Sequence, residues 1–233
     1  MRWLALIALV GCGTSHAMEP PDGADPDGMT PVDAATDAMT APTAAQLLAK
    51  LATCNRVGGN YATDSGGTQD IPICGLTNAV FWKADLDVDC DGQPSAECNS
   101  MTDPSFQAQT SATDSHGNYL DAATLPYVVV PLPSSRFDYN TAGLQFGSVI
   151  AVIYQDKVEY GVFGDEGPTS IIGESSYRMA ANLGIDPDPS TGGADSGVAY
   201  IAFTGASAVT TVIEDHDEAT RIGIAKAQAL LAH

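Results

Sequence analysis

Short apolar runs separated by turn residues recur along the chain from residue 79 onward, and they are rich in β-branched and aromatic side chains. Runs of this length and composition favour β-strands over buried helices. The hairpin signal is clearest at residues 155–157, Gln-Asp-Lys, which separate two adjacent runs. The pattern therefore predicts six strands, over residues 79–82, 127–130, 149–154, 158–163, 198–203 and 209–213.

Helical periodicity is limited to three stretches, residues 44–53, 175–183 and 217–231. The middle stretch has clear boundaries. Ser175 can cap its start, Gly184 can adopt the left-handed conformation at its end, and Pro187 prevents its continuation. The sequence before it, Gly-Asp-Glu-Gly-Pro at residues 164–168, predicts a turn between a strand and this helix.

The first residues are typical of an export signal. Residues 1–12 hold one positive charge followed by an apolar run too short to span a bilayer as a mature helix. Residues 9–12, Leu-Val-Gly-Cys, match the lipobox of bacterial lipoproteins, which predicts lipidation of Cys12. Residues 15–17, Ser-His-Ala, offer the alternative of an ordinary signal peptidase site, and cleavage there would release a secreted protein without Cys12.

The next segment, residues 13–45, is rich in Pro, Asp, Ala and Thr and nearly lacks large apolar residues. Such a composition cannot bury a core, so we expect a disordered, solvated tether. Residues 46–233 are sufficient for one core and short for two. We therefore expect one domain there, and we expect it to act as a monomer.

The chain contains 5 cysteines. If Cys12 is lipidated, the other four form an even set, and an exported protein favours their oxidation. Neighbours in sequence close most easily, which favours Cys54 with Cys74 and Cys90 with Cys98. Zinc is the weaker interpretation, because no C-x-x-C pair is present and the four histidines are widely separated.

The charge balance restricts the possible partners. With 9 basic and 29 acidic residues the net charge is −20. A nucleic acid would be repelled, and no basic stripe with aromatic residues exists to bind one. A polycation would be attracted, because an acidic cleft concentrates positive ligands. The same charge also keeps proteins soluble without selecting any substrate.

Two carboxylates, Asp165 and Glu174, lie at the ends of predicted elements, where functional residues concentrate. Hydrolysis of a glycosidic bond requires two carboxyl groups held some ångströms apart. Structural roles remain open for both, since a turn Asp often accepts local amide hydrogen bonds and an acid before a helix can simply stabilise its dipole. We interpret the neighbouring Glu166 as a solvated turn residue.

A family resemblance is carried by residues 160–185, which read Y-G-V-F-G-D-E-G-P-T-S-I-I-G-E-S-S-Y-R-M-A-A-N-L-G-I. This stretch resembles the signature of the chitosanases of glycoside hydrolase family 75, known from fungi and from bacterial homologues. Further matching blocks lie at residues 81–92, 125–131 and 149–161. The resemblance implies an inverting endo-hydrolase of chitosan that uses no cofactor and no metal, with Asp165 and Glu174 as its catalytic pair.

The roles of the two acids depend on their surroundings. A helix dipole would lower the pKa of Glu174 and suit it as the general base, whereas burial and the higher intrinsic pKa of glutamate would suit it as the general acid. We favour Glu174 as the acid and Asp165 as the base.

A run of alternating aspartates follows Trp82, and if the strand continues there, all of them project from one face. The resemblance suggests that they form an acidic wall that binds substrate amines; a merely solvated acidic loop is the alternative. The run also imitates the opening of a calcium loop, although Cys98 stands where the closing Glu would be. The aspartates are Asp85, Asp87, Asp89 and Asp91.

Two aromatic residues, Trp82 and Tyr160, could stack on sugar rings, although aromatic residues beside strands are more often part of a core. Serine hydrolase, nucleotide-binding and zinc-peptidase functions lose their usual support, because the chain has no G-x-S-x-G elbow, P-loop or H-E-x-x-H helix.

Six strands with one helix inserted after a G-D-x-G-P turn predict a mainly β fold. Residues 161–185 also resemble the turn and helix of double-psi β-barrels, including lytic transglycosylase-like and endoglucanase relatives. We therefore expect a compact six-stranded double-psi-like β-barrel with one inserted short helix and a C-terminal helix. Two other functions remain open: a barrel enzyme that acts on peptidoglycan, and a non-catalytic surface module that binds cationic polysaccharide.

Overall fold

The computed structural model describes residues 40–233. The predicted signal, the lipidation of Cys12 and nearly all of the predicted tether lie outside these residues. The first element is α1 (Ala44–Lys50), whose start is fixed by a capping box. The Thr43 side chain accepts from the Gln46 backbone N–H, and the Gln46 side chain accepts from the Thr43 backbone N–H. No helix of residues 40–233 is long and apolar enough to cross a membrane.

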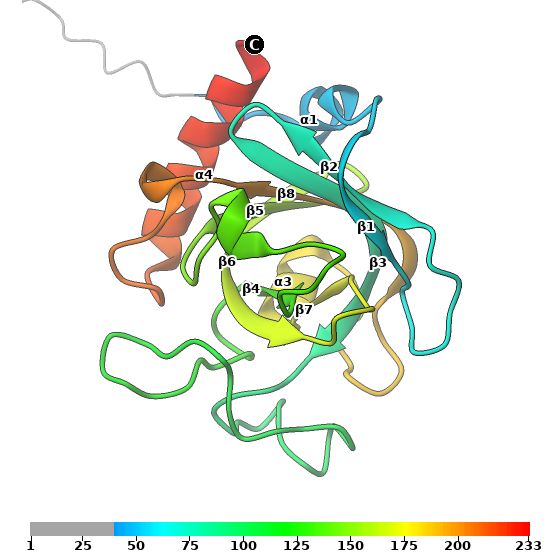
Figure 1. The fold of residues 1–233 in the computed structure, drawn as a ribbon. Helices are drawn as coiled ribbons and strands as arrows, with labels where there is room; N and C mark the ends of the chain where they lie inside the picture. Colours follow the sequence, from blue (N-terminus) through cyan, green and yellow to red (C-terminus); the bar gives the residue numbers. More distant parts are fainter. Residues whose placement is uncertain (1–39) are drawn as a thin grey trace, which may run out of the picture. The chain divides into compact units, whose positions relative to one another are not determined.

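Six strands close into a barrel (Figure 1), as the sequence predicted. Around the ring they follow the order β3 (Ala79–Asp89), β7 (Glu174–Ser176), β4 (Tyr127–Pro131), β6 (Lys157–Gly167), β5 (Val149–Tyr154) and β8 (Ala194–Phe203). The ring closes because β8 also pairs with β3. Two further strands, β1 (Asn55–Tyr61) and β2 (Ile71–Leu76), form an antiparallel hairpin that extends the sheet beside the start of β3.

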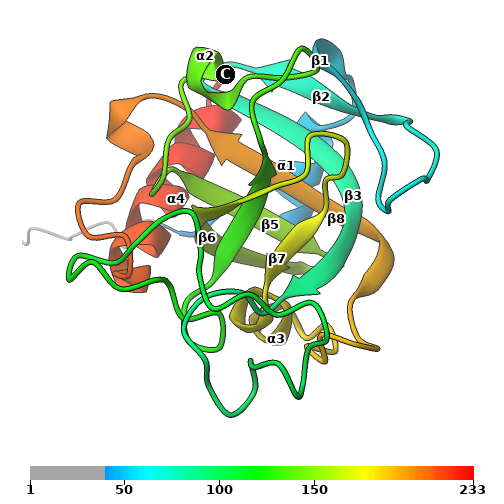
Figure 2. The same ribbon diagram turned by 60° about the horizontal axis from the view of Figure 1, so that its bottom comes forward.

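Side-chain alternation along the strands builds two separate apolar clusters. Trp82 and Leu86 of β3 belong to the interior cluster, together with Val128, Val152 and Tyr200 from other strands. The outward residues of β5, β6 and β8 belong to the second cluster, which is covered by α4 (His216–Leu231). α3 (Tyr177–Leu183) closes one end of the barrel, the end at which β3 terminates (Figure 2).

The helix α3 begins at Tyr177, two residues later than predicted, and its cap lies one residue later. Its cap is Ser176, whose hydroxyl accepts from Met179 N–H at 3.2 Å. Ser175 is not the cap, because it belongs to β7 and is fully buried, paired with Val88 and Val128. The predicted C-terminal boundary is confirmed, since Gly184 ends the helix in the left-handed conformation with φ of 76°.

Residues 209–213 do not form the predicted strand. Val209 makes only an isolated bridge to Ser148. The backbone N–H groups of Thr211 and Val212 donate instead to the carboxylate of Glu218, in the first turn of α4. The apolar run is therefore held by the start of the helix rather than by a neighbouring strand.

Several elements were not predicted from the sequence. The strand β1 contains Asn-Arg and Gly-Gly-Asn, a composition that gives no strand signal, and β7 has only 3 residues. The short helix α2 (Tyr139–Ala142) and the 3₁₀ turn η1 (Ala206–Ala208) were also missed. The predicted turn at residues 164–168 is wrong, because β6 continues through Gly167.

Both disulfides form with the favoured pairing. Cys54 is bonded to Cys74 and Cys90 to Cys98, each pair with a Cα–Cα distance of 5.0 Å. The first bond joins the start of β1 to β2. The second follows the end of β3 and closes the beginning of the long connection to β4, residues 90–126, which contributes to the site described next.

Candidate active site

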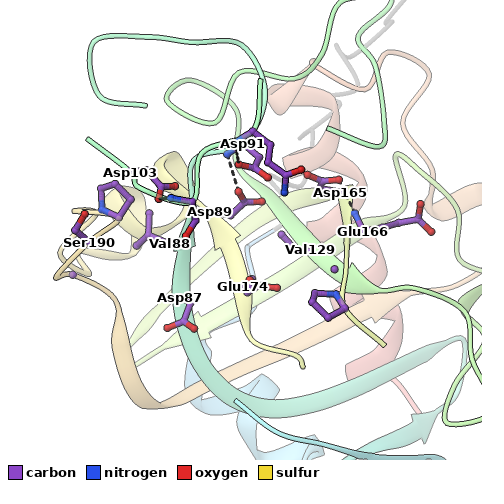
Figure 3. Close-up of a pocket in the computed structure, with 16 residues that line it drawn as sticks. Asp87, Val88, Asp89, Asp91, Asp103, Val129, Asp165, Glu166, Glu174 and Ser190 are labelled. Atoms are coloured by element: carbon purple, nitrogen blue, oxygen red, sulfur yellow. Dashed lines mark hydrogen bonds between the residues drawn. The ribbon is translucent and has the colours of Figure 1, made fainter. Parts of the chain in front are cut away.

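A cleft of about 460 Å³ lies on the outer surface of β3, β7, β4 and β6 (Figure 3). The strands contribute its floor, and the connection at residues 90–126 contributes one side. Seven of the 16 lining residues are acidic, and none is basic. The lining includes Asp87, Asp89, Asp91, Asp103, Gln107, Val129, Asp165, Glu166, Gly167, Glu174 and Ser190.

The two candidate catalytic residues lie in one row across the sheet. Val129 of β4 pairs with Asp165 of β6, and the adjacent Val128 pairs with Ser175 of β7. Because β4 and β7 are antiparallel, Glu174 lies across from Val129 on its other side. Two strand spacings therefore separate the backbones of Asp165 and Glu174, which corresponds to roughly 9–10 Å between their Cα atoms.

A β-bulge at Gly164 turns Asp165 toward this cleft. In the β4–β6 ladder, Phe163 pairs with Val128 and Asp165 with Val129, so Gly164 is an extra residue on β6. Without it, alternation would put Asp165 on the same face as Phe163, which is inside the barrel. Glycine is required here, since a Cβ atom would lie 2.7 Å from the Cβ of Tyr127.

The Asp165 carboxylate is anchored by backbone donors. Its Oδ1 accepts from the N–H of Ser111 and from the N–H of Glu166, each at 2.7 Å. Burial raises the pKa of Asp165, and hydrogen bonds from the Ser111 side chain and from both backbone groups act in the opposite direction. Ser111 was missed in the sequence because it lies on a loop 54 residues before Asp165.

The Glu174 carboxyl has a different environment. Burial raises its pKa to about 7, and the charges of Asp87, Asp165 and Asp91 contribute in the same direction. No residue among 40–233 donates a hydrogen bond to it. The absence of a side chain at Gly167 makes room for this group, because a Cβ there would lie 3.0 Å from Glu174 Oε2.

The acidic wall is formed by three of the four alternating aspartates. Asp87 pairs with Glu174 and extends the row of acids onto β3. Asp89 accepts from the Asp91 N–H at 2.7 Å, and Asp91 accepts from the Gln107 N–H at 2.6 Å. Burial raises the pKa of Asp91 to about 6 and that of Asp89 well above its usual range. Such a group of neighbouring acids favours a cationic ligand.

Comparison with known proteins shows the family to which the chain belongs. Residues 86–225 match the family described as fungal chitosanase of glycosyl hydrolase group 75. The chain belongs to this family. It is 35% identical to endo-chitosanase B of Aspergillus oryzae over 175 residues. This alignment covers 67% of this chain and 73% of the relative. It is also 28% identical over 180 residues to an endo-chitosanase of Aspergillus fumigatus, covering 67% of this chain and 72% of the relative.

The region that matches glycoside hydrolase family 75, residues 86–225, includes all the residues that line the cleft, Asp165 and Glu174 among them. A longer alignment, to endo-chitosanase C of Aspergillus oryzae, has 30% identity over 217 residues and covers 87% of this chain and 54% of the relative.

Three of the residues that the sequence suggested for substrate binding do not line the cleft. Asp85 is only 5% exposed and packs against Gly173, where a Cβ atom would overlap Asp85 Oδ1. Trp82 lies in the barrel interior, stacked on Tyr200 with ring centroids 5.2 Å apart. Tyr160 is buried in the outer cluster. Neither aromatic ring offers a free face to a sugar, because both are part of the core.

The residues that the structure describes do not provide a set of ligands for the calcium loop considered as an alternative. Within residues 40–233, no three His, Cys, Asp or Glu side chains converge so as to hold a metal ion. At the closing position of the loop that begins at Asp87, Cys98 is bonded to Cys90.

Proposed function

We propose that this protein is an endo-acting chitosanase that cleaves β-1,4 linkages between glucosamine units with inversion at the anomeric carbon. The observation that carries the proposal is the row of residues across the sheet, in which Glu174 and Asp165 flank Val129. Inverting glycosidases hold their two carboxyl groups about 6.5–9.5 Å apart, which leaves space for a water molecule. A separation of two strand spacings at the backbone is compatible with this range.

Glu174 serves as the general acid. Burial raises its pKa to about 7, so it retains a proton at neutral and mildly acidic pH. It donates this proton to the glycosidic oxygen while the bond between that oxygen and the anomeric carbon breaks. The leaving sugar then departs with a free hydroxyl group.

Asp165 serves as the general base. Two backbone N–H groups at 2.7 Å favour its charged form, although burial opposes them. The carboxylate accepts a proton from a water molecule, whose oxygen bonds to the anomeric carbon on the face opposite the leaving group. Different hydrogen bonding thus supports opposite protonation states for two neighbouring acids.

The substrate assignment is supported by charge. Asp87, Asp89 and Asp91 line the cleft beside the two acids, and chitosan carries a primary amine on each deacetylated unit. The relatives endo-chitosanase B and endo-chitosanase C of Aspergillus oryzae are named for this substrate.

Export forms part of the proposal. Residues 9–12 support lipid anchoring at Cys12, and residues 15–17 support secretion instead. The two disulfides favour an oxidising compartment in either case. We expect the catalytic domain, residues 46–233, to act as a monomer at the end of a tether.

The decisive experiment measures reducing-end release from chitosan and follows the anomeric protons by NMR. The proposal expects a rapid fall in viscosity, as internal bonds are cleaved, and α-anomers as the first products. Initial β-anomers would contradict inversion. Release of reducing ends from peptidoglycan but not from chitosan would exclude the substrate, and binding of chitosan without release would exclude catalysis.

A further inference from the structure

A second hollow adjoins the cleft on the Asp165 side. It has a volume of about 410 Å³ and shares Asp91, Gln107, Asp165 and Glu166 with the cleft. Its remaining lining comes from the connection between β3 and β4, including Gln109 and Tyr119. The two hollows therefore form one continuous depression, and a polymer in the cleft can extend into the second hollow.

Tyr119 is unusual among the aromatic residues of this protein. It is 41% exposed, and it is the only aromatic residue among the exposed large hydrophobic side chains of residues 40–233. Leaving an aromatic ring in water forgoes the free energy that burying it would contribute. An exposed ring at the wall of a substrate depression is therefore a candidate contact for a ligand.

The backbone at Tyr119 is held in place. Its carbonyl oxygen accepts from Gln93 Nε2 at 2.6 Å, and it forms a bridge with Thr113. The following residue, Leu120, is buried and donates its N–H to Thr110 Oγ1 at 2.9 Å. A ring on a fixed backbone loses little conformational entropy when a ligand binds.

The polar groups around the ring complement a sugar. Glu166 borders both hollows, and its Oε1 accepts from Tyr139 Oη at 2.6 Å, which fixes the carboxylate. Gln107 and Gln109 supply amide donors and acceptors. A glucosamine ring presents C–H groups on its faces, hydroxyl groups at its edge and one amine. An aromatic face, two amides and a carboxylate match these three features.

We propose that this second hollow is a binding subsite for one glucosamine unit of the polymer, beyond the two sugars that flank the cleaved bond. In this subsite Tyr119 stacks on the sugar ring and Glu166 receives its amine. The proposal rests on the proposed chitosanase function and adds a determinant of chain length. Substrates long enough to reach Tyr119 gain binding energy that shorter substrates lack.

The test compares Tyr119→Ala with Tyr119→Phe on glucosamine oligomers from three to six units. The loss of kcat/KM in Tyr119→Ala should increase with oligomer length and reach about tenfold for the longest, equivalent to about 1.4 kcal/mol. Tyr119→Phe should retain most of the activity, since it keeps the ring. Val57→Ala is the control, because Val57 is exposed on β1 and lines neither hollow. An equal loss at every length, or a Phe variant as poor as Ala, would overturn the subsite.

A binding measurement separates this proposal from the proposed function. Calorimetry with the glucosamine hexamer would use the Glu174→Gln variant, so that the ligand is not cleaved. Adding Tyr119→Ala should weaken binding about tenfold, and adding Tyr119→Phe should not. Unchanged affinity in the Ala variant would refute the subsite even if chitosan is hydrolysed. If Tyr119→Ala weakens binding but the protein with Glu174 intact does not hydrolyse chitosan, the subsite is retained and the proposed activity is refuted.

Discussion

The outer surface of the barrel has two sectors built by the same strand geometry with opposite results. Under α4, the outward residues of β5 and β8 are apolar and buried, as at Ala151 and Ile201. On β7 and toward the ends of β3 and β6 the outward residues include acids such as Glu174, which face the cleft. The comparison indicates that packing on the first sector stabilises the fold, while the second sector holds groups whose burial costs stability.

The strand β6 belongs to both sectors. Tyr160 and Val162 contribute to the apolar cluster, and Asp165 lies in the cleft. The bulge at Gly164 separates the two parts by changing which residues point outward. Substitutions in the cleft sector should therefore change activity without reducing stability. Substitutions in the sector under α4 should reduce stability without changing activity.

The largest effect is expected from the two catalytic carboxyl groups. Asp165→Asn and Glu174→Gln preserve size but remove the proton acceptor and the proton donor, so each should lower kcat by about 10²–10⁴-fold. Initial rates on chitosan test this. The melting temperature of each variant at pH 7 should not fall, because an amide replaces a buried acid. A large drop in melting temperature would show that the cleft sector supports the fold.

The pH dependence should give the next largest effect. Glu174 must be protonated to act, and its pKa is raised to about 7, so kcat/KM should fall about tenfold per unit as pH rises above 7. Activity should also fall at acidic pH, where Asp165 becomes protonated. A rate profile from pH 3 to 9 measures both limbs. An alkaline limb near pH 4.5 would contradict a general acid with the raised pKa of Glu174.

The next prediction concerns a substitution in α4, the helix that covers the apolar sector, which should lower stability and leave activity unchanged. A Cβ atom at Gly223 of α4 would overlap the ring of Tyr160. Gly223→Val should destabilise the fold by about 1–3 kcal/mol through overpacking. The melting temperature should then fall by about 2–4 °C per kcal/mol. At a temperature where the variant remains folded, kcat should equal that of the wild type, and a reduced kcat would show that the sectors are coupled.

The fold was largely predictable because the strongly apolar strands carry local signals. β4, β5 and β8 follow runs such as Val-Ile-Ala-Val-Ile-Tyr, and α3 ends at the predicted Gly184. β1 and β7 were missed because the first has only two large apolar residues, Val57 and Tyr61, and the second is held by pairing with residues distant in sequence. Their ladders depend on tertiary contacts that no local pattern encodes.

The site was predictable only in part. The spacing of Asp165 and Glu174 identified the pair, but the sequence indicated a turn at Asp165 where the structure has a bulged strand. The hydrogen bond from Ser111 and the placement of Tyr119 depend on how the long connection after β3 folds over the sheet. Alternation predicted Asp85 as part of the wall, yet Gly173 covers it and removes it from the cleft.

The smallest effect concerns this covered aspartate. Burial raises the pKa of Asp85 to about 7, and its Oδ1 has no hydrogen-bond partner among the described residues. Its folded pKa therefore exceeds its unfolded pKa of about 3.9. The stabilising contribution of the protonated form is complete below that lower value and is lost as pH rises through about 7.

Asp85→Asn should consequently raise the melting temperature by a few degrees at pH 8 and by clearly less at pH 5, because at pH 5 the folded-state carboxyl is still protonated and only the unfolded-state carboxyl, with a pKa of about 3.9, has ionised. Thermal melts at both pH values measure the difference, and Asp156→Asn in the exposed β5–β6 turn serves as the matched control. An equal shift at both pH values would mean that Asp85 stabilises or strains the fold through packing rather than charge. A gain that is larger at pH 8 than at pH 5 would show that acids beneath the cleft, like those within it, reduce the stability that the α4 sector provides.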